Sequence, residues 1–456
     1  SMLALPEGHA QLHVVTGAET SHRRVFADEL LLRAKAEGLF VFRGGASSST
    51  NPKPLQSLDT VLSAIELLCQ KQPELAARLA ASTKNHAATL RELWPGLAPL
   101  WPSSADHTGP EAYGSQRAAI ALAEVFAALA KEPSGVVLLF DDLDIADDLS
   151  RTVIRTIMDQ VALAPGHRML CVVTGNSPES LSMTPGGALI RLGRLSAEAL
   201  ELHLESTAGK ISESIKSSII DVADGSVTMA SALLRRMIDT KVVTLSEDGW
   251  VSSGQLIEAL RGDESFAELL DRQVNALSHH SLRILSSAAV IGQQFHLDML
   301  TAVTGVPYAD VLQVVNEALG RRILWRETRP GWFCFANDPI HQQLRKHLDP
   351  VEHRGIHKQT VAYLCQHDPE NLYDLAFHYD AAGEGELALT TSLQAARAAR
   401  QRFSLSVAQD QLEIAKRWFS SDDRETGLEI FEGLGTIHLL AGRYNQAADH
   451  LYNSLE

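Results

Sequence analysis

Cysteines and long apolar runs are scarce in this sequence. Only four of the 456 residues are cysteines and none forms a C-x-x-C pair, which excludes a disulfide framework and indicates a reducing compartment. Cys69, Cys171 and Cys334 stand in apolar surroundings, so we expect them to be buried, inert thiols. No stretch approaches the roughly 18 apolar residues of a membrane span, and no secretory leader opens the chain. We therefore expect a cytoplasmic protein that does not enter a membrane.

Positive charge is also in short supply. The chain has 40 Lys and Arg residues against 56 Asp and Glu residues, which gives a net charge of −16. Because Lys and Arg contacts to phosphate dominate nucleic-acid affinity, a nucleic-acid partner is not expected for this segment. Apolar residues make up 45% and charged residues 21%, as is ordinary for globular proteins. At about 100–200 residues per domain, the length predicts several domains rather than one.

Residues 1–195 alternate short apolar runs with longer segments of helical spacing. Continuous apolar runs between helices are typical of strands buried on both faces of a parallel sheet. We therefore predict an α/β domain. Its expected strands are 12–16, 39–43, 136–140 and 169–174, its expected helices are 23–38, 58–70, 73–81 and 116–131, and its expected loops are 44–54 and 95–110.

Residues 196–370 are mostly helical in pattern. We expect a lid-like helical domain over 196–260, with helices 196–207, 212–224 and 229–240 and a hairpin over 242–251 that turns at 247–249. Residues 261–370 are expected to form helices 265–276, 281–292, 297–304 and 308–320, followed by a strand pair at 324–326 and 332–335. Helices that end in a short hairpin are typical of a winged helix, which here need not contact DNA.

Residues 371–456 have the spacing of tetratricopeptide hairpins, in which small residues let two antiparallel helices approach closely. The residues at these offsets include Leu372, Ala376, Tyr379, Ala388 and Ala395, and again Phe431, Leu434, His438, Ala447 and Leu451. Solenoids usually finish with a polar cap, whereas this sequence stops on an ordinary repeat helix. We expect the natural protein to continue, with an output domain beyond.

The sharpest local motif is the strand 136–140 followed by Asp141 and Asp142, in the letters VVLLFDDLDIADD. This pattern places acid at the carboxyl edge of a parallel sheet, where α/β folds bind ligands. In nucleoside triphosphatases the first carboxylate holds Mg²⁺ and the second helps to orient water. The alternative is a strand end before an acidic helix start, with Asp147, Asp148 and Ser150 as caps. The motif alone leaves both interpretations open.

The run FDDLDIADDLS resembles the extended Walker B segment of STAND-type, AAA+-like signalling ATPases. The branch that it resembles includes large ATP-binding LuxR-type regulators and bacterial adenylyl cyclase and protein kinase fusions. Weaker matches follow in the family's order: RLGRLSAEALE at 191–201, DRQVNALSHHSLRILSSAAVIGQQF at 271–295, FANDPIHQQL at 335–344 and DLAFHYDAAG at 374–383. The resemblance implies a P-loop NTPase-like fold for 1–195 and a role in signal transduction or transcription regulation.

The segment after the first strand departs from the family. A phosphate-binding loop should be G-x-x-x-x-G-K-[ST], but the letters from Gly17 are GAETSHRR. His22, Arg23 and Arg24 replace the second glycine, the lysine and the hydroxyl residue. A side chain at the glycine position hinders the backbone from wrapping phosphate, and Arg24 offers no oxygen to a metal ion. If a vestigial nucleotide site persists, the resemblance assigns it Gly17, Arg23, Arg24 and Asp141.

Three further family positions are lost. The strand over 170–174 leads to N-S-P rather than to an arginine before proline, the family's G-N-P turn is replaced by G-S-V from Gly225, and Asn337 replaces a histidine. We therefore expect a pseudo-ATPase that acts as a signalling scaffold or switch. It would bind protein partners through its helical repeats, and no cofactor is expected.

Two alternatives stay open. The first is an active ATP-hydrolysing STAND switch, with ATP or ADP and Mg²⁺, that controls transcription or a fused output domain. In it Arg23 would grip phosphate, Asp141 would hold the metal ion and Asp142 would complete the catalytic pair. The second is a binder of another anionic small molecule, through His22, Arg23 and Arg24 at a helix N-terminus. A homo-oligomer is compatible with each of these functions.

The 18 histidines suggest no metal site, because no spacing such as H-E-x-x-H occurs among them. We expect the histidines that lie close together to be solvated or to cap helices. These are His279, His280, His341, His347, His353 and His357.

Overall fold

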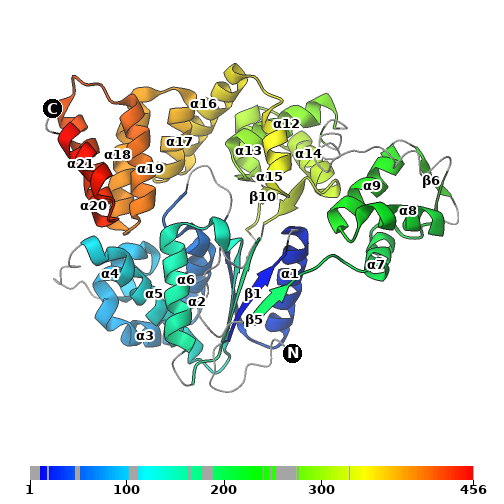
Figure 1. The fold of residues 1–456 in the computed structure, drawn as a ribbon, viewed down its shortest axis with the longest axis horizontal. Coiled ribbons are helices and arrows are strands. Elements are labelled where there is room, and N and C mark those ends of the chain that lie inside the picture. The colour runs from blue at the N-terminus through cyan, green and yellow to red at the C-terminus, as the bar shows by residue number, and fades with distance from the viewer. Residues whose placement is uncertain are drawn as a thin grey trace. The chain divides into compact units, whose positions relative to one another are not determined.

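The computed structural model describes residues 11–17, 20–46, 52–101, 111–162, 166–176, 188–239, 241–246, 249–252, 274, 277–327 and 329–454. It divides into two compact units (Figure 1). The first unit holds residues 1–16, 27–190 and 354–456, and the second holds residues 17–26 and 191–353. The domain boundaries expected at 195, 260 and 370 remain predictions.

The first unit contains a five-stranded sheet. Its strands are β1 (Gln11–Thr16), β2 (Phe40–Gly45), β3 (Val136–Asp141), β4 (Met169–Gly175) and β5 (Ala188–Arg191). Their order is β2-β3-β4-β1-β5, and the pairs β2–β3, β3–β4 and β1–β4 are parallel. The prediction of a parallel α/β sheet is confirmed.

Two details of the predicted sheet are wrong. No strand was expected at β5, because this four-residue segment lacks a continuous apolar run and is largely exposed. In addition, β2 continues through Gly44 and Gly45, which were expected to begin a loop. Glycine weakens a strand but does not prevent pairing, and these glycines lie opposite Phe140 and Asp141 of β3.

Helices cover both faces of the sheet. Alternate strand residues, such as Leu138 and Phe140, join a core formed with α2 to α6. These helices are α2 (Asp59–Lys71), α3 (Pro73–Ser82), α4 (Ala87–Leu93), α5 (Gly114–Ala130) and α6 (Asp148–Ala162). Leu139 and Val172 are fully buried on the opposite face, where α1 (Thr20–Ala36) lies (Figure 1). The sheet is therefore buried on both sides, as its apolar runs predicted.

Successive helices follow in the C-terminal part of the first unit. They are α16 (Pro350–His367), α17 (Leu372–Ala382), α18 (Gly385–Gln401), α19 (Leu405–Trp418), α20 (Arg424–Leu440) and α21 (Tyr444–Asn453). Their shared core contains many small residues, including Ala395, Ala408 and Ala415, all fully buried. Gly435 has the same effect, since a Cβ there would lie 2.7 Å from Leu451 Cγ. Small residues thus allow the close helix approach that the sequence predicted.

Phe403 joins these helices to the α/β part of the same unit. It follows α18 with a positive φ of 60° and belongs to the core that underlies the sheet. Its ring packs over Gly114 at the start of α5, where a Cβ would lie 2.4 Å from Phe403 Cδ1, and the guanidinium carbon of Arg117 lies 5.7 Å from the ring centroid. Beside it, Arg400 forms a bidentate ion pair with Glu111, with both N–O distances at 2.8 Å. The contact is therefore apolar at its centre and charged at its edge.

A polar cluster of two buried histidines and a partly exposed ion pair forms a second contact within this unit. Nδ1 of His357 on α16 lies 2.8 Å from Nδ1 of His378 on α17. Lys53, which precedes α2, pairs with Asp374 at 2.7 Å, and Asn371 also donates to this carboxylate. Burial alone would raise the pKa of the Asp374 carboxyl, but the charge of Lys53 and the hydrogen bonds from Lys53 and Asn371 together lower it. The cluster therefore places an ion pair beside a histidine pair.

The expectation that the clustered histidines are solvated or cap helices is wrong for two of them. His341 and His357 are buried. A neutral imidazole can be buried when its ring nitrogens find partners, and His341 Nε2 lies 2.8 Å from the carbonyl oxygen of Ala289. The exposed members are His279, His280 and His347.

The second unit is mainly helical. Its helices are α7 (Ala197–Ala208), α8 (Glu213–Ala223), α9 (Val227–Asp239), α12 (His279–Ile291), α13 (Leu297–Thr304), α14 (Tyr308–Gly320) and α15 (Asp338–Arg345). A hairpin follows α9, with strands β6 (Val243–Ser246) and β7 (Gly249–Ser252), and a small sheet has the order β8-β10-β9. The strands of this sheet are β8 (Gln294–His296), β9 (Leu324–Arg326) and β10 (Trp332–Phe335).

Some predictions lie outside the described residues. The helix expected at 265–276 does so except for residue 274, as does most of the turn at 247–249. Part of the loop expected at 95–110 is a 3₁₀ helix, Pro95–Leu100.

The prediction that Cys69, Cys171 and Cys334 are buried is confirmed, since all three are buried free thiols. Among the described residues, no helix combines the length and the apolar character needed to cross a membrane.

We predict that Phe403→Ala lowers the free energy of unfolding by about 3–5 kcal/mol, because a large aromatic ring leaves a shared core. Gly114→Ala should also destabilise the protein, since its new Cβ would collide with that ring. In the double variant the ring is absent, so the two costs should not add. Urea unfolding monitored by fluorescence measures all three variants, with the exposed Tyr444→Ala as a near-neutral control. Strictly additive costs would contradict this contact.

We further predict a loss of stability in mild acid through His378. Burial, helped by the charge of Lys53 and opposed by Asp374, lowers the pKa of His378 from 6.5 to about 4. Between these values the unfolded chain binds a proton that the folded protein excludes. His378 therefore adds full stability above pH 6.5 and loses it as the pH falls toward 4, by up to about 1.4 kcal/mol per pH unit.

His378→Asn tests this prediction, because asparagine keeps a polar group but does not titrate. Urea unfolding at pH 4.5 and 7.5 should show a smaller pH dependence for this variant than for the wild type. His280→Asn, at an exposed position, should retain the wild-type dependence. Equal dependence in His378→Asn and the wild type would refute the assignment.

Candidate functional site

The carboxyl edge of the parallel sheet has one topological switch point. β1 and β4 are neighbours, yet the connection from β1 runs to β2 on one side and that from β4 runs to β5 on the other. Such a reversal opens a crevice at the carboxyl ends of the strands, where α/β folds bind ligands. Asp141 ends β3, which is the other neighbour of β4. The predicted acid pair therefore begins next to this switch point.

Asp141 is engaged by an arginine of the neighbouring strand. In the β2–β3 register Gly45 lies opposite Asp141, and Arg43 lies opposite Leu139. Arg43 and Asp141 are thus diagonal neighbours on one face of the sheet, within reach of a long side chain. Arg43 Nε donates to Asp141 Oδ2 at 2.6 Å. Gly45 offers no side chain that could separate them.

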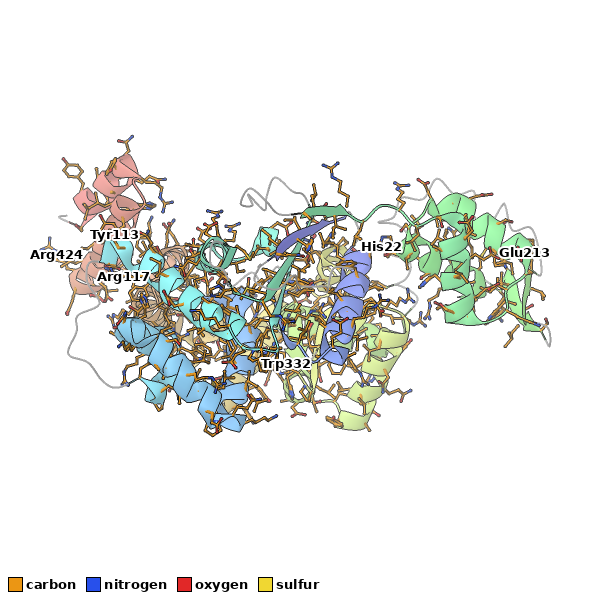
Figure 2. All side chains as sticks on the ribbon, turned by 90° about the horizontal axis from the view of Figure 1, so that it is seen from below. His22, Tyr113, Arg117, Glu213, Trp332 and Arg424 are labelled. Atoms are coloured by element: carbon orange, nitrogen blue, oxygen red, sulfur yellow. The ribbon has the colours of Figure 1, made fainter. Side chains whose placement is uncertain are left out.

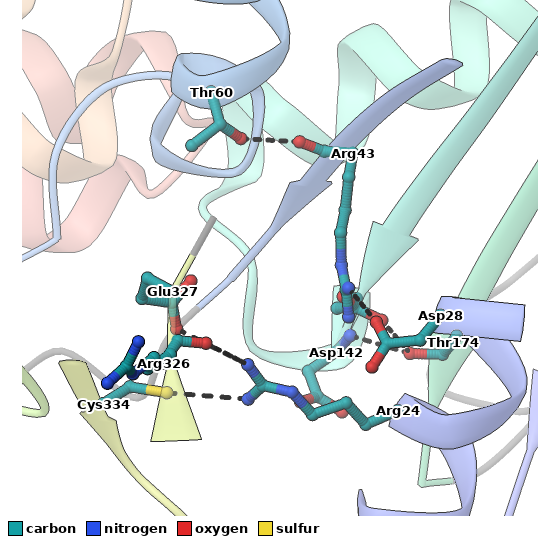
Figure 3. Close-up of polar contacts among 10 residues, drawn as sticks. Arg24, Asp28, Arg43, Thr60, Asp142, Thr174, Arg326, Glu327 and Cys334 are labelled. Carbon is teal, nitrogen blue, oxygen red and sulfur yellow. Dashed lines mark hydrogen bonds and ion pairs between the residues drawn. The ribbon is translucent and has the colours of Figure 1, made fainter. Parts of the chain in front are cut away.

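Arg43 also holds an acid from α1. Its NH1 group donates to Asp28 Oδ1, and its own carbonyl oxygen accepts the Thr60 hydroxyl of α2 at 2.7 Å (Figure 3). Burial alone would lower the pKa of the Arg43 guanidinium, but its ion pairs with Asp141 and Asp28 raise it. Arg43 is therefore a fixed positive charge between two carboxylates.

Thr174, near the end of β4, connects the acid pair to the switch point. Its hydroxyl lies 3.5 Å from Asp141 Oδ1 and accepts the main-chain N–H of Asp142 at 3.0 Å. Asp142 has a φ of 49°, in the left-handed region that aspartate tolerates better than most residues. This turn ends β3 and aims the Asp142 amide at β4.

The residues after the acid pair form a helix start. Asp147 Oδ1 accepts the main-chain N–H of Ser150 at 2.9 Å, and Asp148 begins α6. Burial raises the pKa of Asp147, although its hydrogen bonds from Ser150 oppose the shift. The capping interpretation of this stretch is confirmed for Asp147, whereas Asp148 and Ser150 lie within α6. It does not exclude a separate role for Asp141, which lies on the strand.

Asn176 and Ser177 stand before Pro178, where the resemblance calls for an arginine before proline. The main-chain N–H and the Nδ2 group of Asn176 donate to Asp144 Oδ2 at 3.3 and 2.9 Å. An amide at this place carries no positive charge for a phosphate. Ser177 and Pro178 lie outside the described residues.

Gly17 and the first turns of α1 belong to the second unit, whereas the rest of α1 belongs to the first. Arg23 is only 2% exposed, and its NH1 group donates back to the Gly17 carbonyl oxygen. This guanidinium is therefore directed at the loop backbone of its own chain. Ala18 and Glu19 lie outside the described residues.

Arg24 is directed at the small sheet of the second unit. Its NH2 group donates to the Arg326 carbonyl oxygen at 3.2 Å, and its NH1 group contacts Cys334 Sγ at 3.5 Å (Figure 3). Glu327 lies 4.0 Å away, and the guanidinium stacks over Trp325 at 5.5 Å. Arg24 thus anchors α1 to the hairpin that β9 and β10 form.

His22 lies at the start of α1 (Figure 2). Burial lowers the pKa of His203 on α7, and the nearby charges of Arg322 and His22 lower it further. His22 therefore lies near His203 of α7. The anion-binding hypothesis required His22, Arg23 and Arg24 to present donors together to a ligand, whereas Arg23 and Arg24 both bond to main-chain carbonyl groups.

The residues present do not fit a magnesium–nucleotide complex. Mg²⁺ demands oxygen ligands in near-octahedral geometry. The carboxylate expected to supply one, Asp141, is paired with Arg43, and Arg24 offers nitrogen donors in place of a hydroxyl. Within the part of the chain that the structure describes, no group of three or more His, Cys, Asp or Glu side chains could hold a metal ion.

The sequence-based prediction missed Arg43 and Thr174. One signal was available for Arg43, because it is the single charge in the otherwise apolar run LFVFR. A charge at the end of a buried strand needs a partner, and here the partner lies on a strand distant in sequence. Thr174 offered no such signal, since threonine is common in strands.

Neither a protein-family model nor a curated protein matches the chain. A signal transduction ATPase with numerous domains (STAND) protein with a tetratricopeptide repeat sensor, from Pyrococcus horikoshii, matches with a TM-score of 0.53 and 12% identity, over 98% of this chain and 62% of that one. Cdc6p from Pyrobaculum aerophilum gives 0.34 at 13% identity, over 79% and 90%. A RuvB variant from Thermotoga maritima gives 0.23 at 17% identity, over 61% and 96%.

The last two scores are too low to show a shared fold. The chain spans 62% of the STAND protein's length. The likeness concerns the fold: the sheet with its helices matches a P-loop NTPase-like domain.

Proposed function

We propose that the chain is a regulatory signalling module of the STAND type that has lost ATP hydrolysis. In this proposal it acts as a protein-interaction scaffold or switch within a larger cytoplasmic regulator. One observation carries the proposal: the carboxylate of Asp141, which would bind Mg²⁺ in an active relative, accepts a hydrogen bond from Arg43 at 2.6 Å. The guanidinium of Arg43 then neutralises the Asp141 carboxylate, which a metal ion would otherwise neutralise.

The loop after β1 supports the same conclusion. A phosphate-binding loop works by turning main-chain N–H groups and one lysine toward the phosphates. Arg23, in the lysine position, is buried and bonds to the Gly17 carbonyl oxygen, while Arg24 anchors a hairpin. Both positive charges are thus used for folding rather than for a ligand.

The remaining parts suit a scaffold. We assign α7–α9 to a lid-like helical part, α12–α15 with β8–β10 to a winged helix, and α17–α21 to tetratricopeptide-like repeats that bind protein partners. The repeats expose large aromatic side chains, with Tyr444 at 70% and Tyr452 at 71% exposure. Exposed aromatic residues are enriched at protein interfaces, so they favour a protein partner.

An active ATP-hydrolysing switch is the second candidate. It is favoured by the position of Asp141, which ends a buried strand beside the switch point of the sheet. For that activity Arg43 would have to leave Asp141 when a metal–nucleotide complex arrives. The two candidates therefore differ in how the protein responds to nucleotide.

We predict that the wild-type chain binds neither ATP nor ADP measurably, with or without Mg²⁺. Isothermal titration and thermal-shift series up to millimolar nucleotide should show no change, and Asp141→Asn should behave like the wild type. A Mg²⁺-dependent rise in melting temperature that Asp141→Asn removes would support the active switch and overturn the proposal. Phosphate release measured on the same samples would show whether bound nucleotide is hydrolysed.

We also predict that Arg24 matters for stability rather than for a ligand. Arg24→Ser should lower the free energy of unfolding by about 1–2 kcal/mol, because it removes hydrogen bonds and a cation–π contact at the hairpin. Arg33→Ala removes only an exposed ion pair on the same helix and should cost less than about 0.5 kcal/mol. Urea unfolding compares the two. A neutral Arg24→Ser would show that the hairpin contacts carry no stability.

A further inference from the structure

Four elements of the first unit bring polar side chains to one point on the α1 face of the sheet. We call this set the Arg43 cluster: Asp28 of α1, Arg43 of β2, Asp141 of β3 and Thr174 of β4. The nucleotide-site prediction included only Asp141 of these residues. The cluster therefore comes from the fold and not from a contiguous motif.

Arg43 is the single cation of the cluster. Its guanidinium reaches Asp141 through Nε and Asp28 through NH1, so one rigid fork serves two carboxylates. About a fifth of the Arg43 and Asp141 side chains is exposed, at 21% and 23%. Without Arg43, two carboxylates and the Thr174 hydroxyl would remain as oxygen groups with no positive charge among them.

Arginine suits this place better than lysine would. A guanidinium stays charged at any physiological pH and presents donors in fixed directions, whereas an ammonium is a compact point charge. The backbone of Arg43 is also held, since its carbonyl oxygen accepts the Thr60 hydroxyl at 2.7 Å. The position of the charge is therefore set by the chain and does not depend on a dissociable ion.

We propose that Arg43 permanently supplies, from the chain itself, the positive charge that a metal ion supplies in an ATP-hydrolysing relative, and thereby excludes divalent metal ions from Asp141. This inference rests on the proposed function, because it explains how the carboxyl edge of the sheet at Asp141 keeps its structure when no metal–nucleotide complex is bound. Arg43 is a positioning residue in this view. Oxygen groups such as those of Asp28, Asp141 and Thr174 suit Mg²⁺ and Mn²⁺, so the guanidinium and a metal ion compete for the same acids.

Mn²⁺ binding to the full chain, followed by electron paramagnetic resonance, tests the proposal. The wild type should bind no Mn²⁺ at this site. Arg43→Met keeps the length of the side chain but removes its charge, so its affinity for one Mn²⁺ ion should rise by at least about tenfold. Arg43→Met/Asp141→Asn should lose the gain, and Arg43→Lys, which keeps a cation, should stay like the wild type.

Three results would overturn the proposal. They are a folded Arg43→Met that binds no Mn²⁺ at millimolar concentration, a gain that survives Asp141→Asn, and wild-type binding of Mn²⁺ that depends on Asp141. If Arg43→Met fails to fold, Arg43→Gln takes its place, because glutamine still donates a hydrogen bond but carries no charge. Recovery of the fold by added Mn²⁺ would support the proposal, and failure to recover would oppose it.

These outcomes are distinct from those of the nucleotide titration. If the wild type binds no ATP but Arg43→Met also binds no Mn²⁺, the inference fails while the proposed function stands. If the wild type binds MgATP through Asp141, the proposed function fails first. Circular dichroism on each variant confirms that the compared samples share one fold.

Discussion

The ion pair between Arg43 and Asp141 is the constraint on which the ligand edge of the sheet depends. Three other residues form hydrogen bonds with this pair. Asp28 of α1 and Thr60 of α2 bond to Arg43, and Thr174 of β4 bonds to Asp141. Each is a single hydrogen bond of modest net worth. Together they fix the ends of neighbouring strands and the helices on both faces, so a change at Arg43 would be felt by every element at this edge.

The pair is better understood as a positioning device than as a source of stability. A partly exposed ion pair gains little Coulomb energy over water, and holding a long side chain in one geometry has an entropic cost. Removing one partner is different, because it leaves a half-buried charge without compensation. Forming the pair therefore gains little stability, whereas replacing one of its two residues costs more.

Much of the fold was predictable from the sequence, whereas the site was predictable only in part. Before Asp141 and Thr174, strands β3 and β4 are continuous apolar runs, and burial on both faces of a sheet is typical of such runs. β5 is short and exposed, so no periodicity marked it. Asp141 could be placed at a sheet edge because that position depends on one strand alone. Arg43 could not be paired with it, because a pairing between strands so distant in sequence depends on the strand order.

The contact made by Phe403 was also not predictable from the sequence, although the helices on either side of it were. The spacing of small residues predicted the repeat helices, since helical periodicity is local. That one aromatic residue between two of these helices belongs to the core beneath the sheet could not be inferred, because its partner Gly114 is far away in sequence. The positive φ of Phe403 has a conformational cost, and burial of the ring offsets it.

The two contacts of the repeats with the α/β part have a consequence for a module that does not hydrolyse nucleotide. Such a module needs another input, and the proposed input is a protein bound to the repeats. Asp374 of α17 holds Lys53, which precedes α2, and Thr60 of α2 holds the backbone of Arg43. The segment from Lys53 to Thr60 thus links a contact with the repeats to a contact with the sheet edge. Coupling along it requires an element with two discrete arrangements, and the Lys53–Asp374 ion pair, either made or broken, is an element of that kind.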